Sequence, residues 1–192
     1  GSRAESMSAA APDAAAAAPA GEEPEWEVLY WAAPFRGRGE FLRLLLEYTG
    51  TPYAEPLDTE GCVSLFMKGE TDDYPCFAPP AVRHGGKTIS QSVSAMVYIS
   101  KQLHLLPEGE DDQALAMSVA LTIQDFFAEG YNAFRSGKPG ETYANQKEET
   151  QPFIDAFVEK RVPRFLGYFE RCLARNTEGD KQFFFGTSVT YL

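Results

Sequence analysis

The chain has 192 residues, of which 44% are hydrophobic and 13% aromatic, enough for one domain or two small ones with a hydrophobic core. Its formal net charge of −11 argues against nucleic acid or an anionic membrane surface as a partner of the whole molecule. Three cysteines without paired spacing and two lone histidines predict neither a disulfide scaffold nor a metal site, and they favour a reducing compartment.

The N-terminal segment 1–25 is rich in Ala, Pro and Glu and has no apolar periodicity, which predicts a disordered tail. Aromatic and β-branched residues at 26–32 then predict a strand. Residues 40–50 carry an apolar stripe at helical spacing and end on Gly50, a common helix stop. A short second strand is expected over 51–58.

Residues 59–76 predict a helical turn and then an acidic loop. Two short apolar runs flank Gly85-Gly86, which is a signal for a two-residue hairpin. Ser90 or Ser92 is expected to cap the helix that follows. A strand–helix–strand unit calls for parallel pairing, and the hairpin adds antiparallel strands. Residues 26–105 therefore predict a mixed four-stranded sheet with a thioredoxin-like α/β layout.

The second half of the chain changes character after the polar segment 106–112, which we expect to be a linker. Residues 113–134 and 144–175 carry apolar residues at helical spacing and show no strand signals. An all-α helical domain is therefore predicted over 113–192. The chain ends just after a loop with helix-starting chemistry, so we expect the last helices of this domain to be missing.

The dipeptide Pro79-Pro80 stands directly before the hairpin and has two interpretations. Proline cannot donate a sheet hydrogen bond, so a strand begins after it, and X-Pro bonds are the common sites of a cis peptide. A cis bond here would leave main-chain groups free for an extended, peptide-like ligand. A trans bond would only stiffen the loop, and composition alone favours it, because only about 5–6% of X-Pro bonds are cis.

The polar dipeptide Gln91-Ser92, at the mouth of the predicted helix, is equally ambiguous. Serine at such a position is most often a helix cap. The N-terminus of a helix also presents free N–H groups and partial positive charge, which suit a carboxylate, and a glutamine amide adds a donor and an acceptor beside them. Taken alone, the dipeptide favours the cap.

The order of these pieces resembles the cytosolic glutathione transferases. The resemblance is carried by VLYWAAPFRGRGEFLRLLLEYTGTPYAE, by FAPPAV with HGGKTISQS, and by Asp125 in the first long helix of the all-α half, and it covers residues 26–192. The Tyr-dependent classes are the most similar, with sigma-like and mu-like features. The resemblance implies a cytoplasmic homodimer with glutathione as co-substrate and no prosthetic group, which conjugates or isomerises electrophilic small molecules in detoxification.

The resemblance also assigns roles to residues of the first half. Tyr30 matches the family's catalytic tyrosine, whose hydroxyl hydrogen-bonds the glutathione sulfur. A free thiol with a pKa near 8.5 is mostly protonated at neutral pH, so a phenol donor that stabilises the thiolate supplies the nucleophile. Pro80 matches the family's cis-proline, which turns the backbone toward the cysteinyl part of glutathione. Gln91 and Ser92 match the pair that holds the γ-glutamyl carboxylate.

Further residues complete the implied sites. Arg38 matches the second arginine of an Arg-Gly-Arg motif, and its simpler interpretation is a solvated surface charge. Lys68 is the candidate for a contact to the glycyl carboxylate, and Phe66 lies near the position of a family tryptophan. Asp125 matches an acidic residue that reaches the γ-glutamyl group bound in the other subunit of the dimer. The electrophile pocket is expected on the first long helix, at Ala128, Glu129, Asn132 and Arg135.

Two features depart from the family pattern. The turn from Tyr30 to Arg38 is longer, and Pro79, which precedes the cis-proline position, has no N–H. One hydrogen bond to the cysteinyl part of glutathione is then lost or replaced, a cost of about 0.5–1.5 kcal/mol. These departures motivate an alternative, a non-catalytic binding or structural protein on the same scaffold, like a lens crystallin. A thioredoxin-type disulfide reductase is disfavoured, because AAPFRGRG contains no cysteine.

Overall fold

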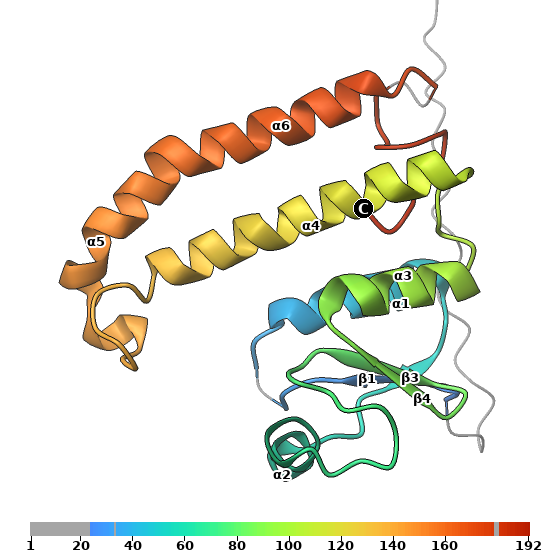
Figure 1. Cartoon of the computed structure of the whole chain (residues 1–192), viewed down its shortest axis with the longest axis horizontal. Helices are drawn as coiled ribbons and strands as arrows, with labels where there is room; N and C mark the ends of the chain where they lie inside the picture. Colours follow the sequence, from blue (N-terminus) through green and yellow to red (C-terminus); the bar gives the residue numbers. More distant parts are fainter. Residues whose placement is uncertain (1–23, 33, 179–180) are drawn as a thin grey trace, which may run out of the picture. The chain divides into compact units, whose positions relative to one another are not determined.

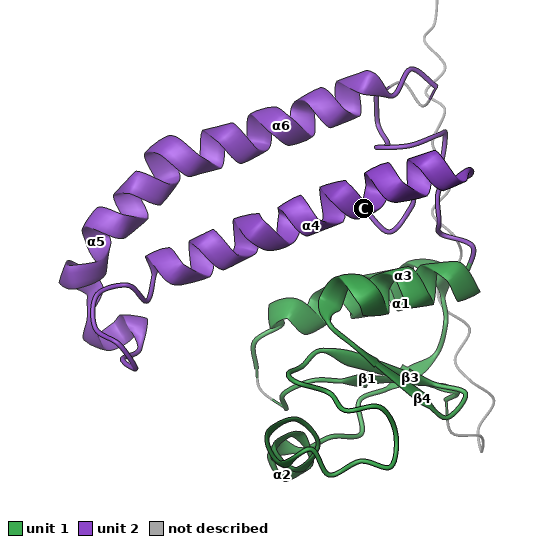
Figure 2. Ribbon diagram, viewed as in Figure 1, with its two compact units in different colours: residues 1–103 green, residues 104–192 purple. Residues whose placement is uncertain are grey.

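The computed structural model describes residues 24–32, 34–178 and 181–192. The predicted tail lies outside these residues, apart from Pro24 and Glu25. The chain divides into two compact units, with the division between Leu103 and His104 (Figure 2). Within the described residues, no helix combines the length and the apolarity needed to cross a bilayer.

Unit 1 is built on a mixed four-stranded sheet in the order β2-β1-β3-β4. Its strands are β1 (Trp26–Leu29), β2 (Tyr53–Ala54), β3 (Ala81–His84) and β4 (Lys87–Ser90). Strand β1 pairs in parallel with β2 and antiparallel with β3, and the β3–β4 hairpin is antiparallel. These pairings confirm the predicted thioredoxin-like layout.

Strand β1 is shorter than the predicted strand 26–32, because its pairing ends at Leu29 opposite Ala81. The next residue of the partner strand is Pro80, which has no N–H to donate to a ladder. Tyr30 therefore lies just beyond β1 rather than at the end of a longer strand.

Helices cover both faces of this sheet (Figure 1). On one face lie α1 (Glu40–Thr49), which follows the 3₁₀ turn η1 (Gly37–Gly39), and α3 (Ser92–Gln102). On the other face α2 (Thr59–Cys62) runs into the π-helical segment η2 (Val63–Lys68). Helix α1 ends as predicted at Gly50, which takes a left-handed φ of 64°.

The alternation of β1 and β3 supplies a core on each side of the sheet. One core gathers the buried side chains Leu29, Cys62, Leu65, Phe66, Cys76 and Ala81. Toward α1 and α3, the fully or nearly fully buried residues include Val28, Leu42, Leu46, Val82 and Ile99. The predicted stripe of α1 is thus confirmed at its centre, whereas Tyr48 at its end is exposed.

The predicted serine cap of α3 is wrong. The N-cap residue is Gln91, and no side chain forms a cap hydrogen bond there. Ser92 is already helical and buried, and the first helical bond runs from the Ala95 N–H to the Gln91 carbonyl. Gln91 has a φ of 70°, a left-handed conformation that is strained for a residue with a Cβ.

All regular elements in the described part of unit 2 are helical, as predicted, and the described residues after Arg175 form turns and irregular chain. Its elements are α4 (Glu110–Ala133), η3 (Tyr143–Asn145), α5 (Lys147–Ala156), the π-helical η4 (Phe157–Arg161) and α6 (Val162–Arg175). Helix α4 begins inside the predicted linker 106–112. Its first turn carries Glu110, Asp111 and Asp112, whose negative charges favour a helix N-terminus.

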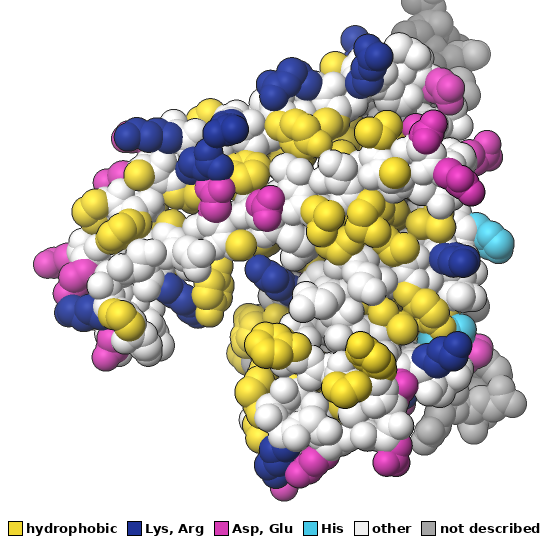
Figure 3. Space-filling model, viewed as in Figure 1, with side chains coloured by type: hydrophobic (Ala, Val, Ile, Leu, Met, Phe, Trp, Pro, Cys, Tyr) yellow, Lys and Arg dark blue, Asp and Glu magenta, His cyan; other side chains and the backbone are white. Residues whose placement is uncertain are grey.

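Aromatic side chains join α4 to the segment formed by α5, η4 and α6. The ring of Phe126 lies 5.6 Å from that of Phe157 and 5.2 Å from that of Phe165, measured between centroids. Hydrophobic side chains also gather on the surface of α4 and α6 (Figure 3), and Leu115, Leu121 and Leu166 are each more than half exposed. Their helical spacing predicted the helices correctly, but not their burial.

Candidate active site

The ends of three strands bring predicted site residues of unit 1 into one row. In the sheet register Leu29 pairs with Ala81, and Ala81 pairs with Ser90. Because both pairings are antiparallel, extending the register by one position beyond the last paired residues reaches the residue after β1, the residue before β3 and the residue after β4. These residues are Tyr30, Pro80 and Gln91. Main-chain groups from distant parts of the sequence therefore meet at one end of the sheet, as an extended ligand would require.

The Pro79-Pro80 peptide bond is cis, as the resemblance implies and against what composition alone favours. Pro80 is fully buried, whereas Pro79 is only partly buried. Pro79, which has no N–H, thus lies two residues before the start of β3 and directly before Pro80 of the row.

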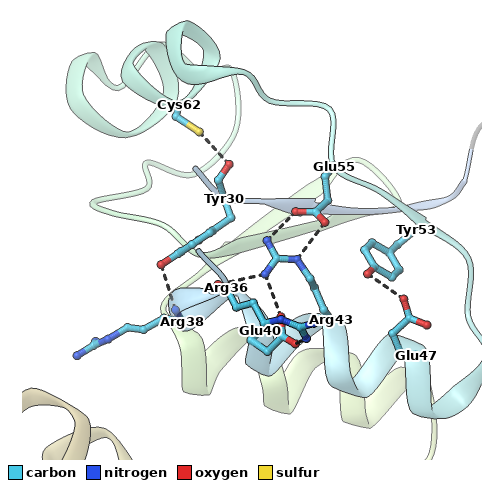
Figure 4. Close-up of polar contacts among 9 residues, drawn as sticks. All are labelled: Tyr30, Arg36, Arg38, Glu40, Arg43, Glu47, Tyr53, Glu55 and Cys62. Carbon is cyan, nitrogen blue, oxygen red and sulfur yellow. Dashed lines mark hydrogen bonds and ion pairs between the residues drawn. The ribbon is translucent and has the colours of Figure 1, made fainter. Parts of the chain in front are cut away.

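Tyr30 is buried, with a side chain that is 8% exposed. Its hydroxyl oxygen accepts a hydrogen bond of 3.0 Å from the backbone N–H of Arg38, in the turn that leads into α1 (Figure 4). That N–H belongs to the start of a helical segment, where such donors lack an intrahelical partner. The side chain of Arg38 points away from Tyr30. Arg38 therefore contacts the tyrosine through its main chain, which the sequence interpretation did not anticipate.

Two glycines let the turn approach the Tyr30 ring. Gly37 has a φ of 52°, and a Cβ added there would lie 2.2 Å from the Tyr30 hydroxyl oxygen. A Cβ at Gly39 would lie 2.8 Å from Cγ of the same ring. Heavy atoms do not approach so closely without displacement, so glycine at both positions is what allows the ring and the turn to pack.

The main chain of Tyr30 is held from the opposite face of the sheet. The Cys62 thiol donates to the Tyr30 carbonyl oxygen at 3.1 Å, and Cys62 is fully buried. Burial raises the pKa of the Cys62 thiol, so the proton that it donates is retained at neutral pH. Nothing in the spacing of the cysteines indicated this contact.

Arg43 connects the turn, helix α1 and the segment after β2. Its Nε and Nη2 donate to the Glu55 carboxylate at 3.0 and 2.7 Å, and its Nη1 donates to the Arg36 carbonyl at 3.1 Å and to Glu40 at 3.3 Å (Figure 4). The paired carboxylate of Glu55, foremost, raises the pKa of Arg43 above its usual value. The guanidinium carbon lies 5.7 Å from the centroid of the Tyr30 ring.

Arg43 and its partners Arg36, Glu40 and Glu55 line a pocket of about 550 Å³. Its lining combines charged groups with aromatic ones, among them Trp31, Phe35, Glu47 and Tyr53. Burial, followed by a hydrogen bond to Glu47, raises the pKa of Tyr53 to about 12. Sequence reasoning missed this group of residues. The spacing of Glu40 and Arg43 indicates a helix-surface pair, but it gives no sign of Glu55.

The other predicted glutathione residues differ in their burial and in the elements that carry them. Gln91 is exposed and Ser92 is buried at the start of α3. Lys68 lies exposed at the end of η2, 3.8 Å from a carboxylate oxygen of Glu70. Asp125 is exposed on α4 of unit 2.

The predicted electrophile residues follow one another along the C-terminal part of α4. The Glu129 carboxylate accepts two hydrogen bonds of 2.6 Å from Arg161, so it is engaged within unit 2. The guanidinium carbon of Arg135 lies 4.0 Å from the centroid of the Tyr131 ring. Asn132 is exposed and Ala128 is partly buried.

Comparison with known proteins gives a match to a domain family and to curated relatives. Residues 138–192 match the family model described as "Glutathione S-transferase, C-terminal domain". The chain is 25% identical over 162 residues to a glutathione S-transferase of Plasmodium falciparum, covering 81% of this chain and 70% of that one. It is 28% identical over 175 residues to the hematopoietic prostaglandin D synthase of Gallus gallus, covering 88% and 74%.

The fold has solved counterparts as well. A monomeric glutathione S-transferase from the hookworm Necator americanus superposes with a TM-score of 0.62 over 87% of this chain and 75% of its own. At 20% sequence identity this likeness concerns the fold alone. The domain match and the curated relatives are thus similarities to glutathione S-transferases and a prostaglandin D synthase, and the solved structure adds a shared fold.

Proposed function

We propose that this protein is a glutathione transferase in which Tyr30 activates the thiol of glutathione for conjugation to, or isomerisation of, electrophilic small molecules. Glutathione is the co-substrate, and the nucleophilic sulfur belongs to it rather than to the protein. The relatives named above, a transferase and a prostaglandin synthase, support this choice of chemistry.

One observation carries the proposal. The Tyr30 hydroxyl oxygen accepts a hydrogen bond from the protein, while its own O–H is not used as a donor to any described residue. Its oxygen accepts the Arg38 N–H, and among the described residues it has no other hydrogen-bond partner. The O–H proton therefore remains available to a ligand. A thiolate that accepts a hydrogen bond from this O–H is favoured over the thiol, because a hydrogen bond to a charged group is worth about 1.5–3 kcal/mol. The N–H of Arg38 strengthens the same donor by polarising the phenol oxygen.

The other residues of the row supply places for the rest of the tripeptide. Cis-Pro80 directly precedes Ala81, which pairs with Leu29 next to Tyr30, and it suits the cysteinyl backbone. The start of α3 at Gln91 and Ser92 suits the γ-glutamyl carboxylate. The strained φ of Gln91 supports a functional reason for that residue, since strain of this kind tends to persist where a site requires it. Lys68 is retained as the candidate for the glycyl carboxylate.

The finer assignments are also part of the proposal. We expect a cytoplasmic enzyme of sigma-like or mu-like class that acts in detoxification. We further expect a homodimer, in which the exposed Asp125 reaches glutathione bound to the other subunit, and an electrophile pocket that includes Ala128, Asn132 and Arg135. The monomeric hookworm relative is the reason to measure the oligomeric state rather than assume it.

Binding to immobilised glutathione and conjugation of a chromogenic aryl halide test the function on the full-length chain. The expected result is retention on the resin, measurable turnover, and a loss of about tenfold or more in turnover for Tyr30→Phe, in line with removal of one charge-stabilising donor. A folded protein whose glutathione dissociation constant is weaker than several millimolar would instead support a non-catalytic protein on this scaffold.

A further inference from the structure

We infer that Arg43, gripped by Glu55, is a positioning residue for Tyr30. The inference rests on the proposed function, because it gives Arg43 the task of holding the group that activates the thiol. Arg43 does not belong to the sheet-end row itself, and it is assigned no direct contact with glutathione.

Arg43 is anchored by Glu55. Both nitrogens on one side of its guanidinium bind Glu55, at 3.0 and 2.7 Å, which is the bidentate geometry that gives arginine pairs their rigidity. The Arg43 side chain is 16% exposed, whereas that of Glu55 is 41% exposed, so the arginine end of the pair is the shielded one. Glu55 lies just after β2, the strand that pairs with β1, so the anchor is tied to the sheet itself.

Arg43 also binds the backbone of the turn that leads into α1. The remaining fork nitrogen, Nη1, donates to the carbonyl of Arg36 at 3.1 Å. Arg36 directly precedes Gly37 and Arg38, whose backbone touches the Tyr30 hydroxyl. Without this bond the turn would be fastened chiefly by its own helical continuation into α1. With it, the N–H of Arg38 is fixed in place relative to the sheet from which Tyr30 emerges.

Arg43 also lies near the ring of Tyr30. The Arg43 guanidinium carbon lies 5.7 Å from the Tyr30 centroid, within the range of an attractive cation–π contact. Arg43 thus restrains both the tyrosine ring and the turn that bonds its hydroxyl. A lysine could supply the charge, but it could not bind Glu55 in a bidentate manner and Arg36 at the same time.

A double-mutant cycle tests this inference. Arg43→Met and Tyr30→Phe are measured singly and together in the full-length protein, with kcat/KM for conjugation as the readout. If Arg43 acts through Tyr30, Arg43→Met lowers kcat/KM by roughly tenfold in the parent and by less than about twofold when Tyr30→Phe is already present. Glu55→Gln, which leaves Arg43 in place but weakens its anchor, should give a loss of the same kind and smaller size.

A matched control comes from the same sheet. Arg83 of β3 binds Glu27 of β1 through one hydrogen bond of 2.7 Å, and among the described residues this pair has no hydrogen bond to the turn or to Tyr30. Arg83→Met should leave kcat/KM unchanged. Thermal unfolding of each variant identifies any that fails to fold. If Arg43→Met fails to fold, Glu55→Gln replaces it in the double-mutant cycle.

A spectroscopic readout separates positioning from general stability. In protein with isotope-labelled tyrosine, the ring signal of Tyr30 is assigned by its absence in Tyr30→Phe. That signal should shift in Arg43→Met and stay in place in Arg83→Met.

The outcomes distinguish the two claims. Full activity in Tyr30→Phe contradicts the proposed function, and the role of Arg43 falls with it. An impaired Tyr30→Phe combined with an equal loss from Arg43→Met in both backgrounds contradicts only the inference about Arg43.

Discussion

Each of the two units contains an arginine that binds a glutamate through two hydrogen bonds and lies near an aromatic ring. In unit 1 Arg43 binds Glu55 in a bidentate manner and lies 5.7 Å from the Tyr30 centroid. In unit 2 Arg161 binds Glu129 through two bonds of 2.6 Å and lies 5.2 Å from the Phe165 centroid. By hydrogen-bond geometry alone, the pair in unit 2 is the tighter of the two.

Their surroundings separate them. The Arg161 side chain is 37% exposed. Arg161 belongs to η4 and its partner Glu129 to α4, so this pair connects two helical elements at the surface of unit 2. The Arg43 side chain is 16% exposed, and it also binds the backbone of the turn that contacts Tyr30. The effect of an ion pair on the site therefore depends more on the other contacts of its members than on the distances within the pair.

The largest effect is expected from the glycine that the Tyr30 hydroxyl touches. Gly37→Ala would place a methyl group 2.2 Å from the hydroxyl oxygen, which must displace either the ring or the turn. We expect kcat/KM to fall by about 100-fold, comparable to the loss of an oxyanion donor. Steady-state kinetics on the folded variant gives the answer.

Gly86→Ala is the control for backbone strain. Gly86 in the hairpin has a φ of 73°, but nothing lies within 4 Å of an added Cβ. This variant should lose about 1–2 kcal/mol of stability from the left-handed conformation while keeping its activity. Equal losses of activity in the two glycine variants would contradict the account of Gly37.

A medium effect is expected from the thiol that holds the Tyr30 carbonyl. Cys62→Ala removes this donor, whereas Cys76→Ala removes a thiol from the same buried cluster without touching Tyr30. Both variants should lose about 1 kcal/mol of unfolding free energy, as is usual for truncations in a core. Only Cys62→Ala should also lower kcat/KM, by about threefold, because a less constrained donor stabilises the thiolate less well. Identical kinetics for the two would remove Cys62 from the support of the site.

A smaller effect is expected from the ion pair of unit 2. Arg161→Met should lower the free energy of unfolding only slightly, since a pair exposed by about a third is well screened. Its kcat/KM should stay within about twofold of the parent, in contrast to Arg43→Met. Denaturant unfolding and kinetics on the same preparation make the comparison. A loss of activity as large as that of Arg43→Met would break the distinction between the two pairs.

The smallest effect concerns acid stability. The hydrogen bond from Arg161, foremost, lowers the pKa of Glu129 below its ordinary value of 4.5. A carboxyl whose pKa is lowered by folding stabilises the protein above its unfolded pKa, and this contribution disappears as the pH falls through the folded value. The difference in melting temperature between parent and Glu129→Gln should therefore shrink as the pH falls from about 6 to 3. A difference that grows toward acid pH would reverse the sign of this account.

The fold was largely predictable from local chemistry. The Gly85-Gly86 signal identified the hairpin, and the apolar stripe of 40–50 with its terminal glycine identified α1. These features depend on neighbours in sequence, which is why they can be read there. The serine cap of α3 could not be predicted in the same way, because the chain enters that helix through the left-handed Gln91 and buries Ser92 instead.

The site was predictable only in part. Tyr30, Pro80 and Gln91 were proposed from the resemblance, and extending the sheet register by one position puts them in one row. The contacts that hold Tyr30 come from Cys62, from the backbone of Arg38 and from Arg43 with its partner Glu55. None of these follows from spacing, because each joins different elements of the fold, and main-chain donors carry no mark in the sequence.

Titration of the glutathione thiol on the protein tests the central claim most directly. The ultraviolet absorbance of the bound thiolate is followed against pH for the parent and for Tyr30→Phe, each saturated with glutathione. A hydrogen bond of about 1.5–3 kcal/mol to the thiolate corresponds to a shift of about 1–2 pH units. We expect the thiolate to form at a lower pH in the parent by that amount. The same midpoint in both proteins would contradict the assignment of Tyr30 as the group that activates the thiol.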